Sequence, residues 1–517
     1  MTVTWARRIA AGLLIAAWLV LGAVLVGWHA FDDDEFQHAH LAWAIAHGQV
    51  PYRDVFEHHL VLYHVLIGPV AAWCGNPAAV FVLRAVSWLC GGIAGLFAVR
   101  VARRYGVDPL ITGLVAVVMA AVPMIGFKLA EARPAVPALL CCAFAIDYAT
   151  RAAINWRRAA VLGAVLGTAI LLSQKMVYLA IALGAGVTLT GGLAAAIACL
   201  LSAMTVGGLY LAAMAGWGCL APFWEFAVMM NLHWKRSFSA SLYVNEWFRS
   251  APLLLAAAIP GLAHLHWRRD AVLVSAVVGG AAMVVLVPVP FRQAFLPLAW
   301  VVVVCAAIAI AQSQALWRSP AVAATAVLAA CAALGLQHQA QWQTNASDRA
   351  QLAAITERFP VGPVFDGRGL VWNREALGFY PIMHEGIALM LDADRYAAAT
   401  IAELEAAWPP VIADYRVAKM PAAVQSFLAD RYRVDGAIDG LLVPGVVVPR
   451  SQLRRGTVVT IPVAGAWRIE WTGGPLLVDD EVVRESSVVA LTVGEHRIRA
   501  QGFVRDVVLR LEHIDAP

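Results

Sequence analysis

Charged residues are scarce in this chain, and the scarcity is confined to its first two thirds. Asp, Glu, Lys and Arg make up 14% of the 517 residues, against about 25% in soluble globular proteins. Residues 1–336 hold 32 charged residues, whereas the remaining 181 positions hold 40. The first part has the composition of a membrane protein and the second that of a soluble domain. This composition excludes a wholly soluble enzyme and a disordered chain.

Cysteine is absent after Cys331, and none of the eight cysteines belongs to a Cys-x-x-Cys pair. The sequence therefore gives no sign of a disulfide framework or of a cysteine-based zinc motif. Tandem repeats and low-complexity segments are also lacking. The net charge of +4 comes from loops beside apolar segments, so we expect no nucleic-acid partner.

Long apolar runs fill the first part of the chain. A bilayer core requires about 20 apolar residues per helix, and eleven runs meet or approach that length. These predicted spans are residues 9–29, 78–99, 109–127, 134–150, 159–173, 176–190, 192–216, 251–267, 271–288, 293–312 and 320–336. The fold class expected for residues 1–336 is thus an α-helical polytopic membrane domain with about 11 transmembrane helices.

The distribution of Arg predicts how these spans are oriented. Alternation of the spans gives two sets of loops, and one set carries eleven Arg with few acids. The positive-inside rule makes that set cytoplasmic. An odd number of spans then places the N-terminus in the cytoplasm and the C-terminal part outside it. The first run follows Arg7 and Arg8, and we interpret it as a retained helix rather than a cleaved signal peptide.

The C-terminal part is predicted to contain two extracytoplasmic units. Residues 337–450 alternate short strand patterns with helical patterns, which is typical of a small α/β domain. Residues 451–517 contain short alternating apolar runs separated by Gly, which predicts a small β-sandwich-like module.

The densest polar chemistry lies in the first outer loop, residues 31–77. Four consecutive acids, Asp32 to Glu35, follow the first apolar run. One of them could simply cap the helix that follows, since Asp satisfies free N–H groups at a helix start. A single Asp would suffice for a cap, however, and four adjacent carboxylates repel one another. Repulsion and partial burial raise carboxylate pKa values, which suits a general base.

Histidine and aromatic residues follow the acids. Seven of the fourteen His lie between His29 and His64, and two helices along the membrane surface are expected up to His47 and over 57–73. A structural metal bound by the His cluster is an alternative, but no clear ligand set emerges, and Glu35 and His38 are the pair that shares a helix face. We therefore assign no metal ligands, and the use of a divalent cation as cofactor remains an alternative.

The order of these features resembles a known family. An N-terminal helix, an outer Asp-Glu loop, a helix, a Gly-x-x-Pro-Tyr-x-Asp sequence and a His-rich helix precede many spans and an outer C-terminal domain. This order resembles the GT-C glycosyltransferases, in the branch that holds protein O-mannosyltransferases and lipid A aminoarabinose transferases. The matching motif residues are Asp34, Glu35, Gly48, Pro51, Tyr52 and Asp54.

The resemblance implies a polyprenyl-phosphate sugar as donor and a bacterial inner membrane location. It also implies that an Asp of the first outer loop takes the proton of the acceptor hydroxyl, with inversion at the anomeric carbon. Asp34 matches that Asp best, Asp33 is its rival, and Glu35 adjoins them. The family often has Arg-Pro-Asp in the next outer loop, but here Ala135 follows Arg133-Pro134. Glu131 lies about one helical turn earlier and is the candidate replacement.

Outward-facing cations and motif residues complete the candidate site. A phosphate leaving group needs positive charge, and an ionisable residue near a membrane span is costly unless it has a function. Lys175, Arg292, Arg133 and Lys128 are the candidates for binding the donor phosphate, with anchoring to lipid headgroups as the alternative. The candidates for acceptor or sugar binding are Tyr52, Asp54, His58 and His59.

The function expected is an integral-membrane inverting glycosyltransferase that acts on a lipid, glycan or protein acceptor at the outer face. A transporter or flippase of polyprenyl-linked sugars is an alternative, although its polar groups should lie near mid-membrane rather than at one face. A non-catalytic glycan-binding membrane protein is a second alternative, which Ala135 and the β module favour.

Overall fold

The computed structural model describes residues 2–234, 239–313, 342–378, 393–414 and 416–514. The chain forms two compact units, Met1–Asn345 and Ala346–Pro517. The division falls after Asn345 rather than after residue 336.

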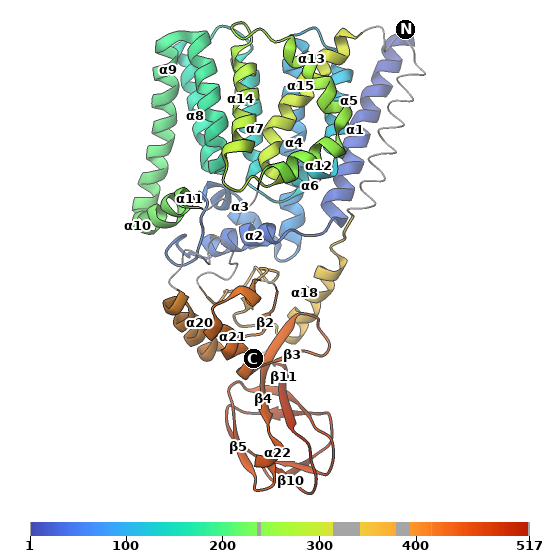
Figure 1. The fold of residues 1–517 in the computed structure, drawn as a ribbon, viewed down its shortest axis with the longest axis vertical. Helices are drawn as coiled ribbons and strands as arrows, with labels where there is room; N and C mark the ends of the chain where they lie inside the picture. The colour runs from blue at the N-terminus through green and yellow to red at the C-terminus, as the bar shows by residue number, and fades with distance from the viewer. Residues whose placement is uncertain (1, 235–238, 314–341, 379–392, 415, 515–517) are drawn as a thin grey trace. The chain divides into compact units, whose positions relative to one another are not determined.

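The described residues of the first unit form helices joined by loops (Figure 1). Its α-helices are α1 (Thr2–Trp28), α2 (Asp33–Ala46), α3 (Leu62–Cys74), α4 (Ala78–Arg103), α5 (Pro109–Ala121), α6 (Pro123–Ala130), α7 (Ala135–Ala149), α8 (Trp156–Leu172), α9 (Val177–Gly216), α10 (Leu220–Phe223), α11 (Met230–Leu232), α12 (Ser241–Ser250), α13 (Pro252–Ala263), α14 (Ala271–Leu286) and α15 (Leu296–Gln312). Short 3₁₀ turns, η1 (Gln174–Met176) and η3 (Arg292–Phe295), precede α9 and α15, and a π-helix, η2 (Trp224–Met229), follows α10.

The described helices confirm a membrane protein but not the number of spans. By length and composition four helical segments can cross a membrane: Arg7–Trp28, Ala78–Arg103, Gln174–Gly216 and Arg292–Gln312. The runs at 134–150, 251–267 and 271–288 form shorter apolar helices, and 159–173 forms α8. Eleven full spans therefore stay a prediction, and 320–336 lies outside the described residues.

The run at 109–127 is not the single straight span that we predicted. It forms α5 and α6, which are bent by 88° relative to each other. Val122 between them is extended because Pro123 follows it, and a residue before Pro avoids the helical region. The bent pair would count as a fifth crossing. The bend turns α6 away from the axis of α5, and the end of α6 carries Lys128.

Loops that belong to the same predicted set contact one another. At one face, Arg104 contacts Asp147, and the Tyr105 hydroxyl donates to Asp270 at 2.9 Å. At the other, Leu60 donates its backbone N–H to Gln174 at 3.2 Å, and Asn231 donates to the His58 carbonyl at 2.6 Å. Helices α2 and α3 lie at this second face, at the end of the bundle away from the N-terminus (Figure 1).

Helix α2 begins and ends where its sequence predicts. Asp32 is its N-cap in a capping box with Glu35, and His47 ends it before Gly48, which has a φ of +88°. The second surface helix differs from the prediction. It starts at Leu62, so residues 57–61 form a loop instead of its first turn.

The second unit begins with short strands and helices. Helices α18 (Ala346–Arg358), α20 (Ala393–Ala407) and α21 (Ala422–Arg431) accompany the short strands β1 (Phe365–Asp366), β2 (Val411–Ile412) and β3 (Tyr432–Val434). β1 and β2 are parallel, and β2 pairs antiparallel with β4 (Leu441–Val448).

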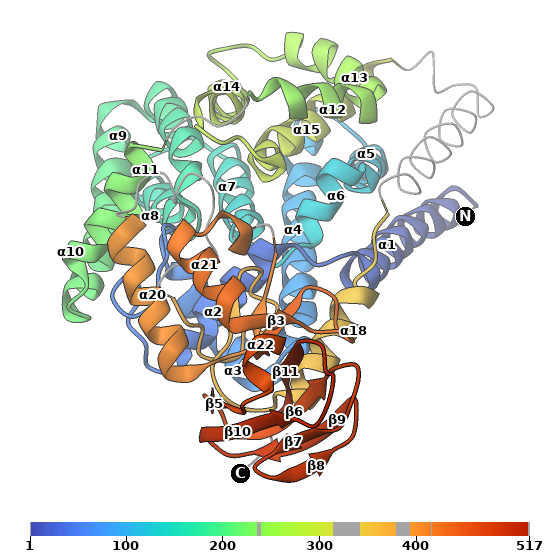
Figure 2. The same ribbon diagram turned by 60° about the horizontal axis from the view of Figure 1, so that its bottom comes forward.

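The C-terminal strands form two sheets, as expected for a sandwich-like module (Figure 2). These strands are β5 (Thr457–Ile461), β6 (Gly465–Glu470), β7 (Leu476–Val478), β8 (Glu481–Val483), β9 (Ser487–Leu491), β10 (Gly494–Ala500) and β11 (Val507–His513). One sheet has the order β5-β10-β7-β8, and the other runs β1-β2-β4-β11-β6-β9. β4 lies within the predicted α/β portion, but it pairs with β2 and β3 of that portion and with β11 of the other, so one sheet continues across residue 450. Trp467, Leu509 and Ile498 are fully buried in the core.

Candidate active site

The site is built from the start of α2 and the end of α6. Glu35 anchors this junction, because its side chain is fully buried and surrounded by donors. It accepts hydrogen bonds from Arg84 of α4 at 2.8 and 2.5 Å, and from the N–H groups of Ala132 at 2.7 Å and Asp32 at 2.9 Å. A buried carboxylate with this many partners fixes the geometry of the junction. Because its oxygens are occupied and shielded from solvent, Glu35 is not placed to take a proton from a substrate.

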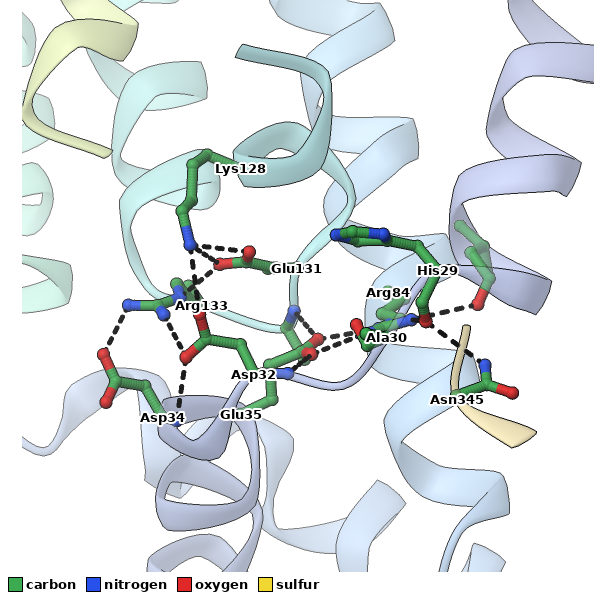
Figure 3. A network of polar contacts seen from close by, with 12 residues as sticks. His29, Ala30, Asp32, Asp34, Glu35, Arg84, Lys128, Glu131, Arg133 and Asn345 are labelled. Atoms are coloured by element: carbon green, nitrogen blue, oxygen red, sulfur yellow. Dashed lines mark hydrogen bonds and ion pairs between the residues drawn. The ribbon is translucent and has the colours of Figure 1, made fainter. Parts of the chain in front are cut away.

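Two cations and two acids meet beside this anchor (Figure 3). The Lys128 ammonium donates to Glu131 at 2.6 and 2.8 Å and to Asp32 at 3.1 Å. Arg133 forms ion pairs with Glu131, at 2.5 Å, and with Asp32. Glu131 is 4% exposed, so its charge is compensated by neighbouring cations rather than by water. We call Asp32, Asp34, Glu35, Arg84, Lys128, Glu131 and Arg133 the acid cluster.

Two acids of the cluster reach solvent, Asp34 and, at 32% side-chain exposure, Asp32, whereas Glu35 and Glu131 are buried. The Asp34 carboxylate accepts a hydrogen bond from Arg133 at 2.6 Å, and its side chain is 40% exposed. Asp32 is engaged by two cations and by the Asp34 N–H. Burial alone would raise the pKa of Asp32, but Arg133 and Lys128 hold the pKa of that carboxyl far below its ordinary value. Asp32 is therefore a weak proton acceptor, whereas Asp34 can reach a substrate. Asp33, the rival candidate, lies in the first turn of α2 and is partly exposed.

Lys175 stands apart from the other candidate cations. It lies in η1, within electrostatic range of both Arg133 and Asp34, and its ammonium is 5.7 Å from the centre of the Phe291 ring. Among the described residues it has no hydrogen bond or ion pair. By contrast, Arg292 of η3 forms an ion pair with Glu246 of α12 at 3.0 Å and lies over the Tyr243 ring.

Two motif residues predicted to bind an acceptor serve the loop itself. Tyr52 is 1% exposed, and its hydroxyl donates to the His59 carbonyl at 2.7 Å. Its φ of +67° is unusual for an aromatic residue, so the loop constrains it strongly. Asp54 accepts the Val50 N–H at 2.8 Å and pairs with Arg53, which closes the turn. Since Tyr52 is buried, it cannot touch an acceptor in this conformation.

The two predicted histidines are organised by an acid that the sequence reading overlooked. Glu57 Oε1 accepts the N–H groups of His58 at 2.8 Å and His59 at 2.9 Å, and it lies 2.6 Å from His59 Nδ1. The His58 carbonyl also accepts from Asn231 and, at 3.3 Å, from Gln174. The His58 and His59 side chains remain 15% and 26% exposed.

Arg84 is the partner that the sequence signalled but that we missed. It is a single charge inside the predicted span 78–99, and an ionisable residue within an apolar span has a buried partner or a function by default. Glu57, Asn231 and Gln174 carried no comparable signal, because they are polar residues among others in outer loops.

Together these residues present a proton acceptor beside positive charge. Three cations of the acid cluster face four carboxylates, so the cluster offers no spare positive charge of its own. Lys175 adds one further cation at its edge. Such an arrangement can accept a proton at Asp34 and stabilise an incoming anion at Lys175.

Comparisons with known proteins give a limited structural likeness. No family model matches the sequence, and no curated protein matches it. Among solved structures, the chain is similar to ArnT from Cupriavidus metallidurans bound to undecaprenyl phosphate, with 14% identity and a TM-score of 0.45. The match covers 67% of this chain and 65% of that structure, which is just under two thirds of its length.

Proposed function

We propose that this protein is an integral-membrane inverting glycosyltransferase that uses a polyprenyl-phosphate sugar. The observation that carries the proposal is the pairing of the partly exposed Asp34 with Arg133, next to Lys175. The motif resemblance of residues 34–54 to GT-C enzymes supports the same role for Asp34. The acceptor is a hydroxyl group on a lipid, glycan or protein.

The reaction is a single displacement. The acceptor oxygen attacks the anomeric carbon, its proton passes to Asp34, and the bond from that carbon to the phosphate oxygen breaks. The polyprenyl phosphate leaves with the bonding electrons, and Lys175 stabilises its charge. One displacement inverts the configuration at the anomeric carbon.

Glu131 takes the place of the acid missing at position 135. Its carboxylate reaches the same guanidinium, that of Arg133, as Asp34 does. Its role is to hold Arg133 and Lys128 in place. Both of these cations are engaged by carboxylates, so Lys175 is the stronger candidate for the donor phosphate.

The test is transfer from radiolabelled polyprenyl-phosphate sugars by the full chain in reconstituted membranes. Asp34→Asn keeps the shape of the side chain but cannot take a proton, so turnover should fall by about 10²–10⁴. Asp33→Asn, on the same turn of α2, is the matched control, and its turnover should fall much less. Unchanged turnover in Asp34→Asn would remove it as the base.

Testing a panel of polyprenyl-phosphate donors that carry different sugars separates this proposal from its alternatives. Transfer of any sugar that is lost in Asp34→Asn supports the enzyme. Donor binding without transfer, across the whole panel, would contradict the enzyme and favour a glycan-binding or transport protein.

A further inference from the structure

A second group of chemically active side chains lies where α2, α3 and the loop between them meet. His38 comes from α2, His64 from α3 and Glu57 from the loop, and they are 4%, 0% and 0% exposed. One nitrogen or oxygen of each lies within 4.8 Å of the others. Three segments thus converge on one point that the proposed transfer reaction does not use.

The two oxygens of Glu57 have different surroundings. Oε1 is held by the N–H groups of His58 and His59 and by the His59 ring. Oε2 is buried and has no hydrogen-bond partner among the described residues. It faces Nε2 of His64 at 3.7 Å. Burying a carboxylate oxygen without a hydrogen-bond donor carries a desolvation penalty. A cation bound to Oε2 would offset that penalty.

The distances suit one metal ion. Nδ1 of His38 and Nε2 of His64 are 2.9 Å apart, and Nε2 of His64 is 3.7 Å from Glu57 Oε2. Ligand atoms about 2.0–2.1 Å from a tetrahedral zinc ion lie about 3.3 Å from each other. The two observed separations fall on either side of that value, so small side-chain shifts bring the three atoms into place.

The ligand types point to a transition metal rather than to magnesium or calcium. Two imidazoles and one carboxylate are a recurrent set for zinc and its neighbours, whereas magnesium and calcium prefer oxygen ligands. The hydrogen bonds to Oε1 also supply the outer contacts that orient a ligating carboxylate.

We propose that His38 through Nδ1, Glu57 through Oε2 and His64 through Nε2 bind one divalent transition metal ion of the zinc type. The ion leaves a fourth position for water or another donor. It fastens α2 and α3 to the loop that carries His58 and His59. The proposal does not depend on glycosyl transfer.

Metal content of the full chain tests the site directly. The protein, purified through a tag without histidine, is loaded with zinc, freed of excess and analysed by mass spectrometry of the metal. We expect about one ion per chain, as for a single three-ligand site. His38→Gln and His64→Gln should each lose most of it. His47→Gln, an exposed position at the end of the same helix, should keep it. Little zinc in the parent protein, or full zinc in the His38 and His64 variants, would overturn the proposal.

A second measurement covers the case in which those variants do not fold. Cobalt bound to the parent protein should give the intense visible absorption of a four-coordinate ion, and zinc should displace it. Zinc should also raise the melting temperature of the parent protein and of His47→Gln. A cobalt spectrum typical of six oxygen ligands, or no zinc-dependent rise, would contradict the site.

Discussion

Among the described residues of the first unit, two clusters of carboxylates and cations differ in their balance of charge. At one face, the fully buried Asp147 is surrounded by Arg104 at 2.6 Å, Arg100 at 3.6 Å and Arg151. At the other, the acid cluster sets four carboxylates against three cations. Asp147 is enclosed by cations, whereas Asp34 is 40% exposed.

The same residue types therefore serve two ends. Where three cations surround one enclosed carboxylate, the carboxylate is fully compensated and stabilises the junction of helices, while the Arg side chains stay partly hydrated. Where carboxylates are in excess and Asp34, the most exposed of them, reaches solvent, a proton acceptor becomes available. The two clusters differ in their numbers of carboxylates and cations and in the solvent exposure of the carboxylate. Single substitutions can alter the charge balance of each cluster.

Loss of Arg133 should have the largest effect on stability. Arg133→Gln leaves Asp32, Glu131 and Asp34 without their shared cation in a largely buried position. Breaking a buried ion pair costs about 3–5 kcal/mol, so we expect a loss near that size. Thermal or denaturant unfolding in detergent measures it.

Arg53→Gln is the matched control, because Arg53 pairs with Asp54 at the surface and its side chain is 53% exposed. We expect a much smaller loss for that variant than for Arg133→Gln, because solvent screens an exposed ion pair. Equal stability of the two variants would show that the acid cluster is not held together by Arg133.

Loss of Asp147 should destabilise the protein without changing its chemistry. Its three Arg partners are between 27% and 49% exposed and can be hydrated when the carboxylate is lost. Hydrogen bonds to charged groups contribute about 1.5–3 kcal/mol, and we expect Asp147→Asn to cost about 2 kcal/mol. Turnover per folded molecule should match the parent protein. A fall in turnover as large as that of Asp34→Asn would contradict the division of roles between the two clusters.

The sequence predicted much of this architecture because apolar runs and Arg-rich loops are local signals. Asp32 to Glu35 and the end of α2 at Gly48 were also readable, since capping depends on neighbouring residues. The bend after Val122 was missed, although Pro123 signals it. The sequence placed Lys128 and Glu131 in the outer loop after this run, but without the bend the contact of Lys128 with Asp32 could not be foreseen.

The partners of the site could not be predicted, because they come from distant positions in the chain. Glu35 pairs with Arg84, and His38 meets His64, only through the packing of α2 against α3 and α4. Spacing along α2 placed His38 with Glu35, but the fold turns these side chains to different partners.

Lys175 should have a moderate effect on donor binding. Lys175 has no ion-pair partner among the described residues, so its positive charge is available to interact with a phosphate. One charge-assisted contact contributes about 1.5–3 kcal/mol, and we expect Lys175→Gln to weaken binding of a polyprenyl phosphate about tenfold or more. Arg292→Gln is the comparison, because Arg292 already pairs with Glu246. Fluorescence or calorimetric titration measures both. A greater loss in Arg292→Gln would reverse the assignment.

The smallest effect is the pH dependence that Asp32 gives to stability. Arg133 and Lys128 lower the pKa of Asp32 in the folded state although burial opposes this, whereas its ordinary value is 3.8. Its contribution is therefore fully present above about pH 4 and is lost as the pH falls through the lower pKa of the folded protein. Asp32→Asn keeps the N-cap, since Asn caps helices as well as Asp. The difference in unfolding free energy between the parent protein and Asp32→Asn should be constant from pH 7 to about 4 and shrink below that, as linkage requires. A difference that stays constant down to pH 2.5 would show that the charge of Asp32 adds nothing to the balance of the acid cluster.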